Sequence, residues 1–416
     1  MKKHLSLLTA LLLTAAMLLS SCSLASVGTG GAEGTSDSAE SAGGSTVNNE
    51  ITITPSASHT AYAAAMGLRS AVSIYCTYTR TVGGGYPWNP TPTTQSFYTM
   101  GSGVIYRLDG GDAYIITNYH LVYNSSATAN EGMAENIYVY LYGLEKENYA
   151  IPATFVGGSP NYDIAVLRVE DSEVLAMQAA SGTAAAVTVG EEASLYPGMA
   201  TLAIGNPSTE SVGGISVTQG IVSVDSETIT MSAVDSGAET EFRVIRTDTP
   251  VNPGNSGGGL FNDRGEWIGI VNAKLTVDDV ENIGYAIPVD VAQAVADNIL
   301  RNCDGEESVR VKRPLLGIGI QTTALSSWYD PESGLIQKRE TVSIVEVSET
   351  APAFRVGDVI LSLKVGEDFA EITRQHQLLD LMLEGDAGET VIFTVLRDGE
   401  TVEVSAVLTE EHFVEC

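Results

Sequence analysis

One serine in this sequence, Ser256, lies in a glycine-rich turn between apolar segments with the composition of strands. The turn covers residues 247–260, and the apolar segments cover 242–245 and 267–271. A serine hydroxyl attacks a carbonyl carbon only where the backbone turns sharply and directs N–H groups at the oxygen that becomes negative. Gly254 and Ser256 could supply such N–H groups. An isolated G-x-S-G also fits an ordinary hairpin, so the remaining residues must decide.

A serine nucleophile needs a base, and histidine suits that task near neutral pH. The sequence has five histidines, and His120 alone falls between residues 60 and 375. It follows the apolar run 114–119, which we expect to be a strand ending at His120. A buried histidine bonded to backbone is the alternative interpretation.

The base in turn needs a carboxylate that orients it. Asp163 precedes the apolar segment 164–167 and so lies at the edge of a core, where charges are rarely left without a partner. A salt bridge to Arg168 or a role in a turn is the alternative for this carboxylate. Asp248 is the rival candidate, although its neighbours indicate a loop.

Short apolar segments and turn residues alternate between residues 71 and 290, which predicts sandwiches or barrels. Because about 220 residues are too many for one small barrel, we expect two barrels joined through residues 181–190. Helical apolar spacing predicts a closing helix over 289–300 and a short entry helix over 61–70. The expected strands are 71–79, 102–108, 113–119, 136–142, 163–169, 199–205, 220–224, 241–247 and 266–271.

The first 22 residues combine Lys2 and Lys3 with an uncharged apolar run over 5–19. This run is short for a bilayer span and predicts an export signal. Its ending, Leu-Ser-Ser-Cys, resembles the lipobox of bacterial lipoproteins, which implies that Cys22 carries lipid at the start of the mature protein. An ordinary secretory signal is the alternative. Residues 23–60 are rich in Gly, Ser, Ala and Thr and are expected to form a flexible tether.

The formal net charge of −31 argues against nucleic-acid binding, because such a surface repels phosphate. The cysteines after Cys22 are Cys76, Cys303 and Cys416, whose spacing matches no metal site. We therefore expect no metal and no cofactor. At most one disulfide can link these cysteines, and its pairing stays open.

A polar linker is expected over residues 303–312, followed by a smaller domain over 313–410. Apolar strand-like segments cover 314–320, 342–347, 358–363, 390–398 and 401–408, with one helix expected near 374–384. The complete domain assignment is a signal peptide (1–22), a tether (23–60), a larger β domain that contains Ser256 (61–302), this linker and the smaller domain.

The order His120, Asp163, Ser256 is that of chymotrypsin-type proteases. The strings GSGVIY, ITNYHLV, YDIAVLRV, AIGNP, TDTPVNPGNSGGGLFNDRGEWIGI and IGYAIP, collinear over 101–288, resemble the HtrA (Deg) family of trypsin-like serine proteases. PLLGIGI, VGDVILSL and TVIFTVLRDGE resemble the PDZ domain of that family. The resemblance implies a mostly β fold, with a trypsin-like double β-barrel followed by a PDZ domain.

The resemblance also implies the role of each site residue. Ser256 is the nucleophile, His120 the general base and then acid, and Asp163 the orienting carboxylate. The oxyanion hole falls on the stretch Gly254, Asn255 and Ser256.

Two positions of the turn differ from trypsin-like proteases that are activated by cleavage. Asn255 stands where an aspartate pairs with a new N-terminus, so no such cleavage is required. Pro250, which lies with Val251 at the expected specificity pocket, replaces the aspartate that selects basic residues. We expect small or medium aliphatic side chains to be preferred instead.

In the smaller domain, Leu315, Leu316, Gly317 and Ile318 resemble the PDZ loop that binds a chain's terminal carboxylate. An ordinary strand start is the alternative for this loop. The family's A-G-L is replaced by the residues of 353–355, so the peptide specificity stays open.

The function implied is that of an extracytoplasmic, ATP-independent serine endopeptidase of the bacterial cell membrane. Its expected partners are unfolded or damaged proteins, peptide C-termini, and the membrane through a lipid anchor only; a homotrimer is expected. A catalytically silent holdase or scaffold is the alternative.

Overall fold

The computed structural model describes residues 59–83, 91–191, 195–207, 214–273, 283–303 and 308–416, which belong to one compact unit. The expected signal peptide with Cys22, and the tether up to residue 58, lie outside the described residues.

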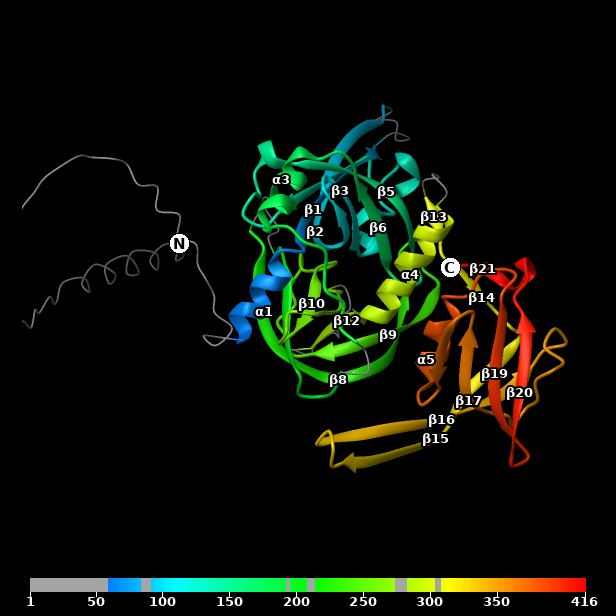
Figure 1. The fold of residues 1–416 in the computed structure, drawn as a ribbon. Coiled ribbons are helices and arrows are strands. Elements are labelled where there is room, and N and C mark those ends of the chain that lie inside the picture. Colours follow the sequence, from blue (N-terminus) through cyan, green and yellow to red (C-terminus); the bar gives the residue numbers. More distant parts are fainter. Residues whose placement is uncertain (1–58, 84–90, 192–194, 208–213, 274–282, 304–307) are drawn as a thin grey trace, which may run out of the picture. The chain divides into compact units, whose positions relative to one another are not determined.

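Strands β1 to β6 form the first barrel (Figure 1). They run in the order β5-β4-β1-β2-β3-β6, and an additional pairing of β5 with β6 closes the ring. Apolar side chains, many of them β-branched or aromatic, fill its interior, including Ile74, Tyr78, Ile115 and Leu167. The strands are β1 (Ala71–Val82), β2 (Thr93–Asp109), β3 (Asp112–Thr117), β4 (Asn136–Leu141), β5 (Ile151–Ser159) and β6 (Ile164–Val169).

Strands β7 to β12 form the second barrel, closed in the order β10-β11-β12-β9-β8-β7. Its smaller core includes Val222, Ile245, Leu260 and Ile268. The strands are β7 (Ala200–Gly205), β8 (Ser216–Ser232), β9 (Glu239–Thr247), β10 (Gly259–Asn262), β11 (Trp267–Val271) and β12 (Gly284–Pro288). The prediction of two barrels is confirmed.

The helices of this region are short, apart from the one that follows the second barrel. The closing helix expected over 289–300 is present as α4 (Val289–Asn302), and the entry helix as α1 (His59–Leu68). The stretch before the expected barrel connection carries a helix that the sequence did not indicate, α3 (Glu173–Ser181). Shorter helical turns are α2 (Tyr119–Val122), η1 (Asn130–Gly132) and η2 (Glu147–Tyr149).

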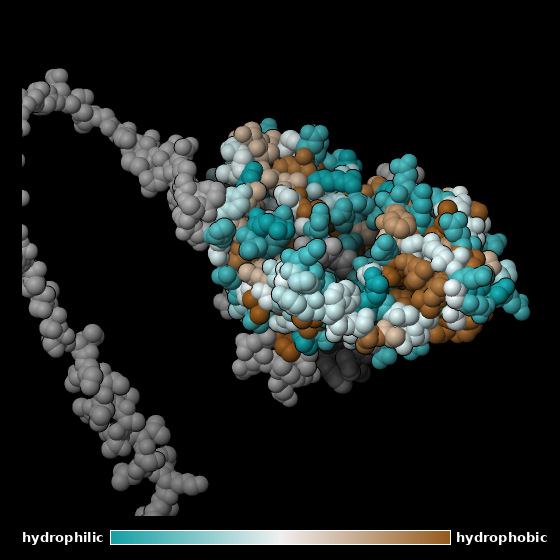
Figure 2. Space-filling view, turned by 60° about the horizontal axis from the view of Figure 1, so that its bottom comes forward, coloured by the Kyte–Doolittle hydropathy of each residue, from teal (hydrophilic) through white to brown (hydrophobic). Residues whose placement is uncertain are grey.

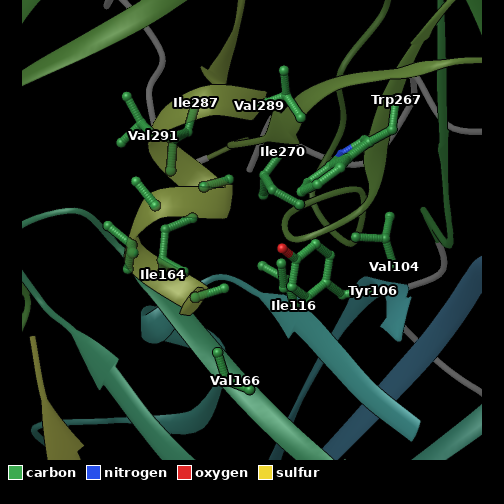
Figure 3. Packing of buried hydrophobic residues seen from close by; sticks show 14 of the residues in the cluster. Val104, Tyr106, Ile116, Ile164, Val166, Trp267, Ile270, Ile287, Val289 and Val291 are labelled. Atoms are coloured by element: carbon green, nitrogen blue, oxygen red, sulfur yellow. The ribbon is translucent and has the colours of Figure 1, made fainter. Parts of the chain in front are cut away.

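Helix α4 packs where the two barrels meet. Its buried side chains, which include Val289 and Val291, join residues of both barrels in one continuous core (Figure 3). This shared core fixes the position of the barrels relative to each other, and so it fixes the loops between them. The barrel residues in the figure are Val104, Tyr106, Ile116, Ile164, Val166, Trp267, Ile270 and Ile287.

The chain after α4 forms the C-terminal domain. Its sheet has the order β15-β16-β17-β19-β20, with β18 beside β17, and it encloses its own core with helix α5 (Gln375–Met382). The strands are β15 (Ile318–Asp330), β16 (Leu335–Val347), β17 (Val359–Val365), β18 (Asp368–Glu371), β19 (Thr390–Arg397) and β20 (Glu400–Val407). A turn, η4 (Glu410–His412), precedes the last strand.

The expected linker is not a free connection. It contains β13 (Val309–Arg310), which pairs in parallel with β5 of the first barrel. Next, β14 (Lys312–Pro314) pairs with β21 (Phe413–Glu415) at the end of the chain. Backbone pairing therefore ties this segment to the two domains that it joins.

Ion pairs also connect the C-terminal domain to the second barrel. Arg243 of β9 binds both Asp290 of α4 and Asp380 of α5. Asp225 of β8 binds Lys338 at 2.9 Å and Arg374 at 2.5 Å. Burial alone raises the pKa of Asp225, but these two cations hold it below its ordinary value.

Hydrophilic and hydrophobic residues are interspersed on the face of the molecule in Figure 2, with hydrophobic residues gathered in one hollow. Within the described ranges, no helix has both the length and the apolar character needed to cross a bilayer. The cysteines Cys76, Cys303 and Cys416 are free.

Candidate active site

His120 and Asp163 are in direct contact. The His120 Nδ1 lies 2.7 Å from Oδ2 of Asp163, and the His120 backbone N–H donates to Oδ1 over 2.9 Å. Asp163 is only 1% exposed. This arrangement fixes both the ring orientation and the nitrogen that faces the carboxylate.

The local backbone that creates this contact differs from the expected strand end. Strand β3 stops at Thr117, and His120 lies in the single helical turn α2. Asp163 precedes β6 with a φ of +50°, in the left-handed region. The Asp163 carbonyl accepts hydrogen bonds from the Asn118 side chain and the Tyr119 N–H. These bonds join the start of α2 to the residue that precedes β6.

The alternative partners are engaged elsewhere. Arg168 binds Glu170 at 2.7 Å rather than Asp163. The rival carboxylate, Asp248, accepts a hydrogen bond from the Ile221 N–H on β8. The structure thus brings His120 to Asp163 and not to Asp248.

Ser256 lies in the loop between β9 and β10 and is 5% exposed. Two consecutive residues after β11 link it to the Asp163 carboxylate. Asn272 donates its side-chain amide to Oδ2 of Asp163 over 2.7 Å, and Ala273 donates its N–H to Oγ of Ser256 over 3.1 Å. Over the described ranges, no hydrogen bond joins Ser256 to His120; such bonds are often long before substrate binds.

Two backbone donors of the Ser256 loop have no acceptor within the described ranges. Asn255 donates its N–H to Asn252, and Gly257 donates to Val271. The N–H groups of Gly254 and Ser256 have no acceptor in the part of the chain that the structure describes. These two groups can therefore receive a developing oxyanion, whereas the N–H of Asn255, expected within the hole, is already occupied.

Gly254 adopts a φ of +96°, which strongly favours glycine. A Cβ at this position would lie 2.2 Å from the Asn206 carbonyl oxygen. The loop therefore requires glycine both for its backbone conformation and for space.

The two residues of the expected specificity pocket differ in exposure. Pro250 is exposed, and its carbonyl accepts a hydrogen bond from Thr218. Val251 is half-buried against the second barrel core, beside Gly284 of β12. The structure therefore places an apolar surface here, without a carboxylate from either residue.

The expected carboxylate-binding loop precedes β15. Leu315 is exposed and donates its N–H to His412, whereas Leu316 is buried. Gly317 has a φ of +74°, and its carbonyl accepts from Ser348. The N–H groups of Leu316 and Gly317 have no acceptor among the described residues, so they can bind an anionic group; Ile318 begins the strand.

Sequence reasoning missed Asn272 and Ala273. The available signal was a polar residue directly after the apolar run 267–271, at the end of a strand. Asn272 is fully buried, and a buried amide needs polar partners. That signal does not identify the partner, Asp163, which directly precedes β6 of the other barrel.

Comparison with known proteins divides the chain in the same way. Residues 101–270 match the family model of the trypsin-like peptidase domain, and residues 316–408 match that of the PDZ domain.

Relatives in several bacteria match most of this chain. The chain is 34% identical over 309 residues to serine protease Do-like HtrA of Bacillus subtilis (strain 168), covering 72% of this chain and 61% of that protein. It thus spans less than two thirds of that relative. Identity is 31% to serine protease Do-like HtrA of Lactococcus lactis subsp. cremoris (strain MG1363), covering 74% of this chain and 70% of that protein. The chain is 32% identical to serine endoprotease DegS of Haemophilus influenzae (strain ATCC 51907 / DSM 11121 / KW20 / Rd), covering 75% of this chain and 77% of that protein.

Among solved structures, the HtrA-type protease AlgW with decapeptide is similar, with a TM-score of 0.51 and 26% identity. The match covers 84% of this chain and 98% of that one.

Proposed function

Since the chain belongs to the HtrA family of serine proteases, we propose that it is an ATP-independent serine endopeptidase of protein quality control. Its substrates are unfolded or damaged polypeptides outside the cytoplasm. The contact of His120 with Asp163, linked through Asn272 and Ala273 to Ser256, carries this proposal.

In the proposed reaction, Nε2 of His120 takes the proton of the Ser256 hydroxyl as Oγ attacks the scissile carbonyl carbon. Asp163 accepts a hydrogen bond from Nδ1 and stabilises the imidazolium that forms. The N–H groups of Gly254 and Ser256 receive the oxyanion. His120 then returns the proton to the leaving amine, and water hydrolyses the acyl-enzyme by the same steps.

The apolar surface at Val251 supports a preference for small or medium aliphatic side chains at the cleavage site, because a charged side chain would lose its hydration there without a partner. The N–H groups of Leu316 and Gly317 support recognition of a peptide's terminal carboxylate by the C-terminal domain, in the manner of PDZ domains.

Location and assembly are part of the proposal. The lipobox-like ending at Cys22 supports a lipid-anchored form, with residues 23–58 as the tether. Cys22→Ala should release the protein from membranes, and continued tight anchorage of this variant would contradict the lipid anchor. The family resemblance supports a homotrimer, which sedimentation of the purified protein can test.

The decisive experiment compares casein hydrolysis by the parent and by Ser256→Ala. Loss of turnover in the variant, with unchanged folding by circular dichroism, supports the protease. Equal turnover by the two proteins would refute catalysis by Ser256. A parent that hydrolyses nothing but prevents aggregation of unfolded casein would favour the holdase.

A serine-directed phosphonate separates the role of the base from that of the nucleophile. The reagent should label Ser256 in the parent and should label the His120→Ala variant far more slowly. Equal labelling rates would contradict the assignment of His120 as the base.

A further inference from the structure

Ser102 of β2 contacts the Ser256 loop but is not one of the three proposed catalytic residues. Its side chain is fully buried. The hydroxyl donates to the Gly254 carbonyl oxygen over 2.7 Å and accepts from the Asn206 N–H over 2.8 Å. Because a backbone N–H can only donate, the Ser102 proton is committed to Gly254.

The backbone of Ser102 binds the same loop. Its N–H donates to the Ser256 carbonyl over 2.8 Å, and its own carbonyl accepts from the Thr117 hydroxyl over 2.6 Å. One residue thus holds the carbonyl groups of both Gly254 and Ser256. The N–H groups of these two residues have no acceptor among the residues that the structure describes.

Because residue 254 is a glycine, the Ser256 loop has backbone conformations open to it that would not form the oxyanion hole. Gly254, with a φ of +96°, can reach other backbone conformations at little steric cost. Rotation of its backbone would carry the N–H away from the oxyanion position. The carbonyl and the N–H of Gly254 belong to the two peptide planes that meet at its Cα. The hydrogen bond from Ser102 holds the plane of the carbonyl, so it limits the backbone rotations of Gly254 that remain possible.

We propose that Ser102 is a positioning residue whose hydroxyl holds Gly254 in the conformation that completes the oxyanion hole. It does so from the first barrel, while its second hydrogen bond ties the position to Asn206 at the end of β7 in the second barrel. The hole is therefore aligned by the packing of the two barrels, and not by its own loop alone. This inference rests on the proposed protease function.

The test compares Ser102→Ala with the matched control Ser70→Ala. Ser70 is also buried, and its hydroxyl also donates to a glycine carbonyl, that of Gly67, away from the catalytic loop. With enzyme concentrations set by phosphonate titration, Ser102→Ala should lower kcat roughly 10- to 100-fold at an unchanged KM. Ser70→Ala should keep the parental kcat and KM. Ser102→Cys, which retains a weak donor, should fall between the parent and Ser102→Ala.

A peptide aldehyde distinguishes positioning from a general loss of structure. The aldehyde forms a tetrahedral adduct whose oxygen occupies the oxyanion hole, so its inhibition constant should rise in proportion to the fall in kcat/KM. An unchanged inhibition constant, or a parental kcat in Ser102→Ala, would overturn the inference while leaving the protease assignment intact.

Crystal structures of the parent and of Ser102→Ala give a readout that does not need activity. The Gly254 carbonyl should leave its β2-facing orientation in the variant. If φ and the carbonyl direction of Gly254 stay as in the parent, the inference is refuted. If the parent itself hydrolyses no substrate, the proposed function fails, and these structures still decide the role of Ser102.

Discussion

Asn272 donates its side-chain amide to the Asp163 carboxylate across the boundary between the two barrels. The acceptor, Oδ2, is the same oxygen that faces Nδ1 of His120. The orientation of the Asp163 carboxylate toward His120 therefore depends on a residue of the second barrel, directly beside Ala273, which contacts Ser256.

Asn272→Ala should lower kcat by roughly 10- to 100-fold, because a hydrogen bond to a charged group contributes about 1.5–3 kcal/mol. Steady-state hydrolysis of a peptide substrate measures the effect. Asn298→Ala is the control, since Asn298 is equally buried and loses hydrogen bonds to Lys312 and Leu383 outside the site. A similar loss of kcat in both variants would indicate a general structural effect.

Gly254→Ala should reduce kcat/KM at least roughly 10²-fold, as expected when an oxyanion donor is displaced. The added Cβ would lie 2.2 Å from the Asn206 carbonyl oxygen, so the loop must move. Gly198→Ala is the matched control, because Gly198 has a φ of +93° but nothing within 4 Å of an added Cβ. Parental activity in Gly254→Ala would show that its N–H is not an essential donor.

The contact between His120 and Asp163 was predictable from the sequence to the extent that it depends on residue type and order. The glycines around Ser256 indicated a displayed nucleophile, and the apolar segment after Asp163 indicated a buried carboxylate. The φ of +50° at Asp163 and the helical turn at His120 were not predictable, since tertiary hydrogen bonds from Asn118 and Tyr119 stabilise them.

In the C-terminal domain, too, the sequence predicted only part of the structure. Its strands were indicated by apolar alternation, but the hairpin of β15 and β16 extends well beyond the expected segments 314–320 and 342–347. The added part is largely exposed, so its sequence carries little hydrophobic periodicity. Residues 303–312 have the polar sequence of a linker. The short pairing of β13 with β5 is made by backbone hydrogen bonds, so it leaves no apolar run in the sequence that would predict it.

Gly317→Ala should weaken binding of a C-terminal peptide by at least roughly tenfold, because the carboxylate contacts of a peptide ligand carry charge-assisted hydrogen bonds. Its φ of +74° disfavours alanine, and the new Cβ would lie 2.2 Å from the Ser348 hydroxyl. Gly334→Ala, at a φ of +70° with open space around it, serves as the control. Fluorescence anisotropy of a labelled peptide measures both, and an amidated peptide should bind the parent as weakly as the variant.

The buried Asp358 forms an ion pair with the half-buried Arg397, and this pair should make the C-terminal domain sensitive to acid. Arg397 binds both carboxylate oxygens, at 2.7 and 2.6 Å, and Asp358 is 1% exposed. The hydrogen bond from Arg397 lowers the pKa of Asp358 below its ordinary value. A lowered carboxyl pKa stabilises the fold above the unfolded pKa of about 3.9, and the stabilisation is lost as the pH falls through the folded pKa.

Replacing Asp358 with alanine should therefore destabilise the domain by about 1.5–3 kcal/mol near neutral pH, because the charge-assisted hydrogen bonds from Arg397 are lost. The difference in unfolding free energy between the parent and Asp358→Ala should shrink as the pH is lowered below about 4, where the parent also loses the ionised pair. Urea unfolding of the full chain, followed by hydrogen exchange in β17 and β19, measures this difference. Glu403→Ala, an exposed acidic position on β20, should leave the free energy within about 0.5 kcal/mol of the parent. A gap between the parent and Asp358→Ala that stays constant from pH 7 to pH 3 would contradict the role of the ionised pair, since a packing defect does not titrate.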